Sequence, residues 1–345
     1  MLQEMIEKLA LPALKTREEM FAMLEELEFG ALPPKPENLR FTVEKEVAIP
    51  KFCAGKAICS RILVECTVNG KEYSFPFHAT IPTKEGKHPF FVMPNFRPDI
   101  PDRHQPTEEI VDRGFAILSF CYQDVTTDND DFTNGLAGIL YPDGIRHNPT
   151  DCGKISMWAW AAMRLMDYAQ TRSDVLDLNR GTVCGHSRLG KTALWTGAND
   201  PRFFAVYSND SGCAGASLAR ENVGESIKAI CDRFPYWFCE NYFAYKDNES
   251  NMPFDQHFLL ALSADRKVLV GSASLDQWAD PKNEYLSCVA ASPAFAKGFV
   301  HPDRLTTDDE TFMEGDLAYQ IRPGLHYFSR TDWNRLCDFV ELKSK

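Results

Sequence analysis

The feature that most constrains this 345-residue chain is a serine between a predicted strand and a predicted helix. The β-prone run 181–184 is followed by Gly185, His186 and Ser187, and residues 191–198 are typical of a helix. A sharp turn between a strand and a helix lifts a hydroxyl clear of the sheet, and the helix N-terminus presents N–H groups that can bind an oxyanion. The stretch therefore favours a sheet covered by helices, with a nucleophilic serine at its edge.

The turn departs from the usual Gly-x-Ser-x-Gly pattern of such a nucleophile elbow. Leu189 stands where the second glycine is expected, and Gly190 follows one position later. A serine that ends a buried strand can also be a plain turn or N-cap residue. The stretch alone leaves the catalytic and the structural interpretation open.

Composition narrows the class of protein. The apolar content of 44% is enough for a large core, and no apolar run approaches the roughly 18 residues that cross a bilayer. A net charge of −12 argues against a nucleic-acid partner. Eleven cysteines, scattered singly without a CxxC pair, indicate free thiols in a reducing compartment. Since no secretory signal is visible, we expect a cytoplasmic protein that binds neither nucleic acid nor membrane.

The order of elements predicts an α/β fold. Continuous apolar runs at 89–93 and 115–120 indicate buried strands, and strands and helices then alternate to the C-terminus. We therefore expect a mostly parallel central sheet with helices on both faces. Before it, β-prone runs between residues 41 and 81, joined by an Asn-Gly turn at 69–70, predict antiparallel strands at the start of the sheet.

We expect one domain, residues 1–345, because the chain shows no repeat, linker or low-complexity tract. Two insertions are predicted, near 123–150 and 221–253. The first contains an acidic run at 128–131 that lacks the spacing of a calcium loop, so we interpret it as solvated. The second is rich in aromatic residues, which is typical of a packed base and compatible with a sugar-binding platform.

A nucleophilic serine needs a base and an acid, and in hydrolases of this topology they follow in the order Asp/Glu, then His. His326 lies between the last strand-like run and an amphipathic helix, which makes it the favoured base. His257 fits a structural position and His301 a surface one. Asp276 directly follows a clear late strand and is the favoured acid, whereas Asp210, at the end of another strand, is the alternative.

Six motifs occur in an order that resembles one family. They are Gly-His-Ser-Arg-Leu-Gly-Lys at 185–191, Ser-Asn-Asp-Ser-Gly-Cys-Ala-Gly-Ala at 208–216, Arg-Phe-Pro-Tyr-Trp-Phe-Cys at 233–239, Pro-Phe-Asp-Gln-His at 253–257, Asp-Gln-Trp-Ala-Asp-Pro at 276–281 and Gly-Leu-His at 324–326. Together they resemble the bacterial glucuronoyl esterases, carbohydrate esterase family 15. The resemblance implies an α/β-hydrolase fold and a serine esterase that cleaves esters of glucuronic or 4-O-methylglucuronic acid through an acyl-enzyme, with a carbohydrate substrate and no metal or organic cofactor.

The resemblance also implies roles for residues of the triad. Ser187 resembles the family's nucleophile and His326 its base. The family places its acid at either of two positions, which match Asp210 and Asp276, and this sequence has an acid at both. We favour Asp276, because it agrees with the order of the strands.

Four further residues resemble the family's binding groups. Arg188 resembles the residue that helps to bind the oxyanion, Lys191 and Glu225 resemble sugar-hydroxyl contacts, and Trp278 resembles the aromatic wall of the uronate site. A fixed cation at position 188 suits a uronate and its developing oxyanion. The structural alternatives are an exposed helix cation for Lys191, a solvated acid for Glu225 and a core aromatic for Trp278.

Two alternatives to glucuronoyl ester hydrolysis remain open. One is another carbohydrate esterase activity, such as deacetylation of xylan, and the other is a non-catalytic carbohydrate-binding protein on a hydrolase scaffold. Members of the family usually act outside the cell on polymer, so a cytoplasmic relative could instead use smaller uronate esters or oligosaccharides. The sequence does not indicate an oligomeric state.

Overall fold

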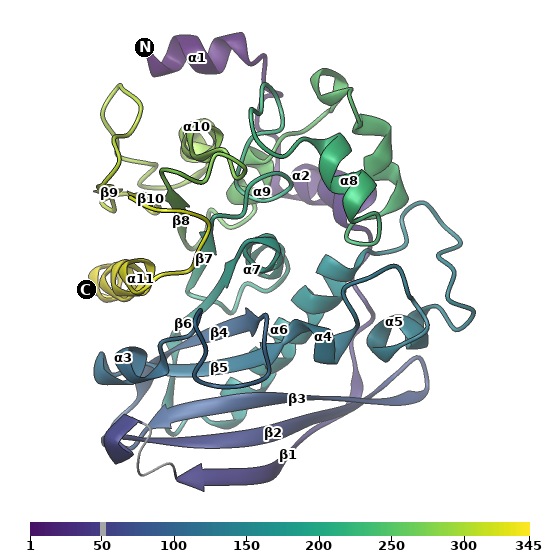
Figure 1. The fold of residues 1–345 in the computed structure, drawn as a ribbon, viewed down its shortest axis with the longest axis vertical. Coiled ribbons are helices and arrows are strands. Elements are labelled where there is room, and N and C mark those ends of the chain that lie inside the picture. Colours follow the sequence, from purple (N-terminus) through teal and green to yellow (C-terminus); the bar gives the residue numbers. More distant parts are fainter. Residues whose placement is uncertain (49–52) are drawn as a thin grey trace.

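A ten-stranded sheet runs through the molecule in the computed structural model, which describes residues 1–48 and 53–345 (Figure 1). The strand order is β1-β2-β3-β5-β4-β6-β7-β8-β10-β9. The strands are β1 (Glu37–Ala48), β2 (Ala57–Val68), β3 (Lys71–Pro82), β4 (His88–Asn95), β5 (Ala116–Cys121), β6 (Leu176–His186), β7 (Ala205–Asn209), β8 (Lys267–Ala273), β9 (Glu310–Phe312) and β10 (Leu317–Arg322).

The central strands β5, β4, β6, β7, β8 and β10 pair in parallel. Strands β1, β2 and β3 form an antiparallel meander that joins the sheet through β5, and β9 adds an antiparallel edge on the opposite side. Asn69 and Gly70 form the turn between β2 and β3, and both have positive φ, 50° and 73°, as a tight hairpin turn requires. The predicted α/β fold, with its antiparallel start, is confirmed.

Helices cover both faces of the sheet. The described helices are α1 (Leu2–Lys8), α2 (Arg17–Leu24), α3 (Thr107–Asp112), α4 (Tyr122–Val125), α5 (Gly135–Leu140), α6 (Lys154–Thr171), α7 (Arg188–Asn199), α8 (Ile227–Arg233), α9 (His257–Ala261), α10 (Pro281–Ala291) and α11 (Arg330–Lys343), with short π or 3-10 turns at Glu25–Phe29, Cys53–Gly55, Glu240–Tyr245, Glu249–Asn251 and Ser292–Ala294. Within the described ranges, no helix is both long and apolar enough to cross a membrane.

Neighbouring side chains of β4 show how the two faces are filled. Phe90 and Val92 belong to the large core that includes α6 and α7, whereas Phe91 and Met93 belong to a second core beneath α3 and α11. Successive residues of a strand point to opposite faces, so a strand that is apolar throughout must be buried on both. This arrangement places the C-terminal ends of β6, β7, β8 and β10 side by side.

The two predicted insertions contain helices and lie on the same side of the molecule (Figure 1). The first carries α4 and α5, and the second carries α8 and two short turns. Trp237, Phe238 and Tyr242 of the second insertion are buried, as expected for a packed base. The two insertions meet where the Tyr236 hydroxyl donates a hydrogen bond of 3.1 Å to the carbonyl of Asp128.

Candidate active site

Ser187 lies at the strained turn between β6 and α7, with φ 59° and ψ −129°. Its N–H donates a hydrogen bond of 2.9 Å to the carbonyl of Asn209 at the end of β7. A Cβ at Gly185 would lie 2.0 Å from the carbonyl oxygen of Leu189, so this turn excludes any side chain there. Gly190 is also tight, since its Cβ would lie 3.0 Å from Ser208 Oγ. The close approach of β7 to α7 thus falls at position 190, which explains the displaced second glycine.

His326 and Asp276 form a hydrogen-bonded pair beside this turn. Asp276 follows β8 and His326 follows β10, and the Nδ1 of His326 lies 2.5 Å from a carboxylate oxygen of Asp276. The carboxylate is buried, whereas the imidazole is about 42% exposed. Because Nδ1–H donates to the carboxylate, Nε2 remains as the proton acceptor. Ser187 and His326 line the same pocket.

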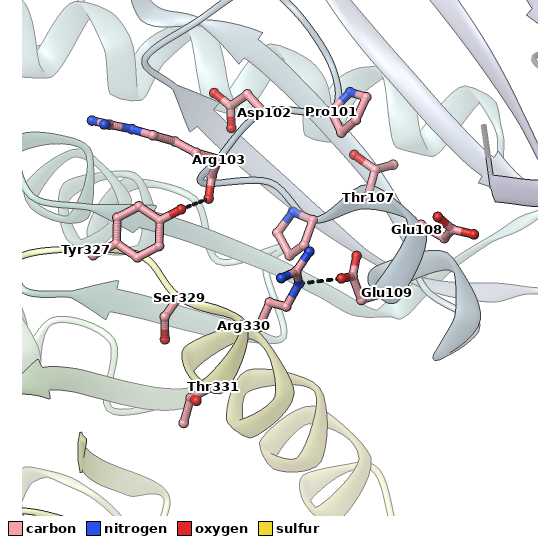
Figure 2. A pocket seen from close by; sticks show the side chains of 11 residues that line it. Pro101, Asp102, Arg103, Thr107, Glu108, Glu109, Tyr327, Ser329, Arg330 and Thr331 are labelled. Carbon is pink, nitrogen blue, oxygen red and sulfur yellow. Dashed lines mark hydrogen bonds and ion pairs between the residues drawn. The ribbon is translucent and has the colours of Figure 1, made fainter. Parts of the chain in front are cut away.

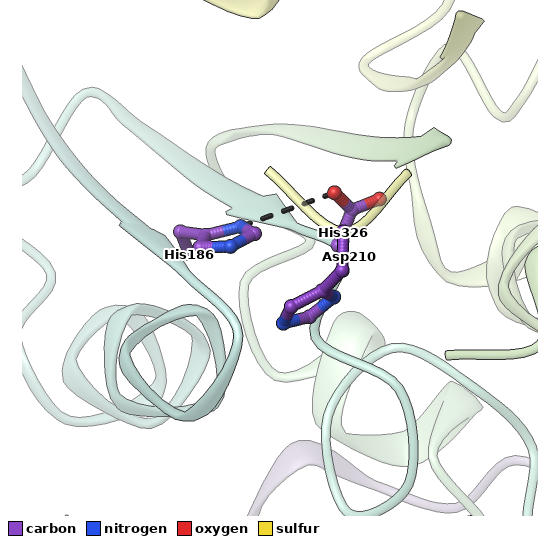
Figure 3. A group of neighbouring side chains, drawn as sticks. All are labelled: His186, Asp210 and His326. Atoms are coloured by element: carbon purple, nitrogen blue, oxygen red, sulfur yellow. Dashed lines mark ion pairs between the residues drawn. The ribbon is translucent and has the colours of Figure 1, made fainter. Parts of the chain in front are cut away.

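Asp210, the alternative acid, lies against the same imidazole. Asp210, His186 and His326 each offer an atom within 4.8 Å of the others (Figure 3). Burial and the neighbouring Glu284 raise the pKa of Asp210 well above its ordinary value. Its Oδ1 is buried and has no hydrogen-bond partner, which favours the protonated carboxyl, and the Arg322 guanidinium, 3.6 Å from its Oδ2, opposes this shift only in part. Asp276 is therefore better placed than Asp210 to carry a negative charge beside His326.

The same three residues are the described group whose spacing could suit a metal ion. Two of its nitrogens, however, are already engaged. The Nδ1 of His186 lies 2.8 Å from the side-chain oxygen of Asn209, and the Nδ1 of His326 is bonded to Asp276. Hydrogen bonding within the chain therefore accounts for this cluster.

Three imidazoles lie next to one another at the site, with His186 stacked on His104 and tilted against His326. The ring centroid of His186 lies 4.5 Å from that of His326 and 5.2 Å from that of His104. Burial lowers the pKa of His186 well below its usual range and that of His104 to about 4. The two inner imidazoles are thus neutral at neutral pH and support the outer ring without adding charge. Sequence reasoning did not identify either inner histidine as part of the site.

A pocket of about 160 Å³ opens over the serine. The residues with sequence-predicted roles that line it are Ser187, Arg188, Lys191, Asp210, Glu225, Trp278 and His326. Asp276 lies behind them, bonded to His326. Phe234 and Trp237, from the second insertion, complete the wall. Their rings stack on each other at 3.8 Å, so the insertion contributes an aromatic face to the pocket.

Lys191, Glu225 and Trp278 depart from the structural alternatives stated for them. Lys191 is buried, not an exposed helix cation, and its ammonium donates to the carbonyl of Ser211. Burial lowers the pKa of Lys191, and the carboxylate of Glu225 opposes that shift. Glu225 is also buried, not solvated, and Trp278 is 53% exposed, not a core residue. The Glu225 N–H donates 2.9 Å to the carbonyl of Trp278, which fastens the two segments together.

Arg188 is held by a carboxylate that we had expected to be solvated. Asp128 is half-buried rather than exposed, with only 9% of its side chain accessible, and it forms an ion pair with the guanidinium of Arg188. The interpretation of the acidic run at 128–131 as solvated is therefore wrong for this residue. The guanidinium also lies over the ring of Trp237, 4.7 Å from its centroid. The partner stands 60 positions away in the sequence, so no local pattern could indicate it.

A larger cleft of about 740 Å³ lies next to the site, between the loop before α3 and the start of α11 (Figure 2). Tyr327, next to the proposed base, donates its hydroxyl to the carbonyl of Arg103 at 2.5 Å, and Arg330 pairs with Glu109 across the cleft. Neither Ser187 nor His326 lines this cleft. The grouping of Ser187, His326 and Asp276 therefore makes the smaller pocket the candidate active site.

Comparison with known proteins places the chain among carbohydrate esterases. A family model described as glucuronyl esterase, fungi, matches residues 64–297. Carbohydrate esterase MZ0003, from an unknown prokaryotic organism, is 36% identical over 244 residues, which cover 68% of this chain and 55% of that protein. The 4-O-methyl-glucuronoyl methylesterase of Podospora anserina is 26% identical over 265 residues, 73% of this chain and 49% of that protein. The chain thus spans about half the length of these curated relatives.

A solved structure agrees over a longer range. The glucuronoyl esterase from Solibacter usitatus superposes with a TM-score of 0.83 at 30% sequence identity, covering 95% of this chain and 91% of that one. The similarity therefore extends over nearly the whole chain.

Proposed function

Because the chain belongs to the glucuronoyl esterase family, we propose that it hydrolyses esters of glucuronic or 4-O-methylglucuronic acid through an acyl-enzyme. One observation carries the proposal. Ser187, on its strained turn, shares a pocket with a histidine whose Nδ1 is bonded to a buried carboxylate, and with the polar groups of Lys191 and Glu225. Relatives named 4-O-methyl-glucuronoyl methylesterase support the choice of substrate.

In the proposed reaction, the hydroxyl oxygen of Ser187 attacks the ester carbonyl carbon while Nε2 of His326 takes the hydroxyl proton. Asp276 stabilises the resulting imidazolium through the bond to Nδ1. When the tetrahedral intermediate collapses, the imidazolium gives its proton to the departing alcohol, and the glucuronoyl group stays on the serine. Water then attacks the acyl-enzyme with the same histidine as base, which releases the uronic acid and restores the serine hydroxyl.

The oxyanion of the intermediate is expected to face the N-terminus of α7. The first N–H groups of a helix have no partner within the helix, and those of Arg188 and Leu189 stand directly after the nucleophile. The Arg188 guanidinium adds a positive charge at the same place. Together these donors stabilise a charge that exists only in the transition state, which raises kcat rather than affinity.

The sugar is expected to lie over Lys191, Glu225 and Trp278. One ammonium proton of Lys191 is donated to Ser211, which leaves two for sugar hydroxyls. The Glu225 carboxylate accepts from hydroxyls, and the exposed Trp278 ring offers an apolar face at the rim. This pairing of a buried donor and a buried acceptor suits a polyhydroxylated acyl group better than a simple acetyl group.

We also propose that the protein works in the cytoplasm, on small uronate esters or oligosaccharides. The support is that all eleven cysteines, which lie within the described ranges, carry free and buried thiols, as is typical of a reducing compartment. Immunolocalisation in the source cell would test this assignment. Recovery of the protein from the culture medium would contradict it.

The decisive experiment is hydrolysis of benzyl glucuronate by the wild type and by Ser187→Ala. We expect turnover by the wild type and a loss of at least roughly 10³-fold in kcat for the variant. Acetylated xylan serves as the competing substrate. Faster release of acetate than of glucuronate would reject the proposed substrate class, and equal rates for the wild type and Ser187→Ala would reject the serine mechanism.

A further inference from the structure

The Arg188 side chain enters the pocket already paired. Its Nη1 is hydrogen-bonded to the Oδ2 of Asp128, and its guanidinium carbon lies 4.7 Å from the ring centroid of Trp237 and 5.3 Å from that of Phe234. A third ring, Phe96, lies at 5.9 Å. The Nε is buried and has no hydrogen-bond partner, and Arg188 lines the same pocket as Ser187. The guanidinium is therefore held by Asp128 and the rings, while 25% of the Arg188 side chain remains accessible.

Asp128 is itself fixed by three aromatic residues. Its Oδ1 accepts a hydrogen bond of 2.7 Å from the indole N–H of Trp237, and its Oδ2 accepts one of 2.7 Å from the hydroxyl of Tyr122. The Tyr236 hydroxyl donates to its backbone carbonyl at 3.1 Å. A carboxylate with this many donors has little rotational freedom, so the direction in which it holds Arg188 is also fixed.

The loop that carries Asp128 is anchored from below by Lys154, the first residue of α6. The Lys154 ammonium donates 2.6 Å to the carbonyl of Thr127 and 2.7 Å to that of Asp131. It also lies over the ring of Phe132, 4.9 Å from the centroid. The acidic loop is thus bonded to Lys154 on both sides of Asp128, which restricts the position of this residue.

We propose that Asp128 is a positioning residue for the esterase reaction, which sets the direction of the Arg188 guanidinium toward the oxyanion. The inference rests on the proposed serine esterase function. Arginine has many rotamers, and holding one of them before the substrate arrives removes an entropic cost from the transition state. Because the oxyanion forms only during reaction, the loss of Asp128 should lower kcat and leave KM nearly unchanged.

A double-mutant cycle tests the proposal. The variants are Asp128→Asn, which keeps the side-chain volume and one acceptor oxygen, Arg188→Met, which keeps apolar bulk between the rings, and the combination of both. Asp130→Asn is the matched control, because Asp130 lies on the same loop, is exposed and loses the same charge. Each protein is compared by kcat, KM and thermal melting on benzyl glucuronate and on p-nitrophenyl acetate.

We expect Asp128→Asn to lower kcat about tenfold or more with KM within twofold. In the Arg188→Met background, the same change should alter kcat less than twofold, and Asp130→Asn should behave as the wild type. An equal loss of kcat with and without Arg188 would overturn the proposal, because Asp128 would then act through the loop alone. An unchanged kcat in Asp128→Asn would overturn it as well.

The second readout separates this inference from the substrate assignment. The rate at which a fluorophosphonate probe labels Ser187 depends on the nucleophile and the oxyanion donors, but not on a sugar pocket. If benzyl glucuronate is not hydrolysed, the proposed substrate is wrong. The labelling rates of the wild type, the two single variants and the double variant still decide the role of Asp128. The expected pattern is again a slower rate in Asp128→Asn that disappears in the Arg188→Met background.

Discussion

The backbone N–H of Gly212 donates a hydrogen bond of 2.9 Å to Oε1 of Glu284, a carboxyl group that is completely buried behind the active site. The other oxygen accepts from the hydroxyl of Ser272, at the end of β8. Gly212 lines the pocket over Ser187, so Glu284 connects the pocket wall to the sheet. Burial raises the pKa of Glu284 to about 8.

This pKa predicts a pH dependence of stability. Between the ordinary value of 4.5 and about 8, the folded state holds a proton that the unfolded state has lost, so the free energy of unfolding falls as the pH rises through this window. Glu284→Gln removes that contribution. We expect the variant to gain stability relative to the wild type between pH 5 and 8, by a few kcal/mol at most, since each pKa unit corresponds to about 1.4 kcal/mol.

Urea unfolding at several pH values measures this difference. Glu240→Gln, an exposed substitution of the same kind, is the control and should follow the wild-type profile. Parallel profiles for the wild type and Glu284→Gln would contradict the assignment of a raised pKa.

Asparagine substitutions at the two candidate acids should lower kcat by different amounts. Asp276→Asn should lower kcat by roughly 10³ to 10⁴-fold, because the amide cannot stabilise the imidazolium and favours the wrong tautomer of His326. Asp210→Asn should lower kcat less than tenfold, since an amide closely resembles the protonated carboxyl that its buried site favours. Steady-state kinetics on one substrate decides between them, and the reverse order would assign the acid to Asp210.

Substitution of Trp278 should affect substrate binding but not the stability of the fold. The ring is 53% exposed, so Trp278→Ala should change the free energy of unfolding by no more than about 0.5 kcal/mol. If the ring forms the rim of the sugar site, KM should rise roughly tenfold with little change in kcat. Leu342→Ala, on an exposed position of α11, is the control. A Trp278→Ala variant with an unaltered KM would remove this residue from the site.

Arg322, the last residue of β10, is expected to hold the loop of His326. Its guanidinium donates to the carbonyls of Pro323, Leu325 and Tyr327 and to the carboxylate of Asp332, the last at 2.6 Å. A lysine ammonium has fewer hydrogen-bond donors than a guanidinium, and they do not lie in one plane, so it cannot replace these bonds. Arg322→Lys should therefore lower both the melting temperature and kcat, whereas the exposed Arg330→Lys should alter neither. Wild-type kcat in Arg322→Lys would show that the loop keeps its shape unaided.

Much of the fold could be predicted because it depends on local patterns. Local features were sufficient: the continuous apolar runs, the turn at Asn69 and Gly70, and the glycines around Ser187 each depend on a few adjacent residues. The order of the strands then limits which later residues can reach the serine. This reasoning placed His326 and Asp276 after the correct strands, β10 and β8.

The remainder of the site depends on burial and on distant partners. Asp210 and Asp276 both follow strands, and only their surroundings distinguish a carboxyl with a raised pKa from one bonded to the imidazole. Asp128 looked like a solvated loop acid because nothing near it in the sequence reveals its contacts with Arg188 and Trp237, which stand 60 and 109 positions away. The same holds for the stacked His104, which stands far along the chain from His186.

The contacts of Arg322 indicate which positions in the loop of His326 can be substituted without loss of the hydrogen bonds that hold it. The loop is held through carbonyl oxygens, which every amino acid possesses, and not through the side chain of Leu325, which is 68% exposed. A substitution at position 325 therefore changes an exposed side chain next to His326 without changing the hydrogen bonds that hold the loop. The exposed surface next to His326 can therefore vary at this position at little cost in stability.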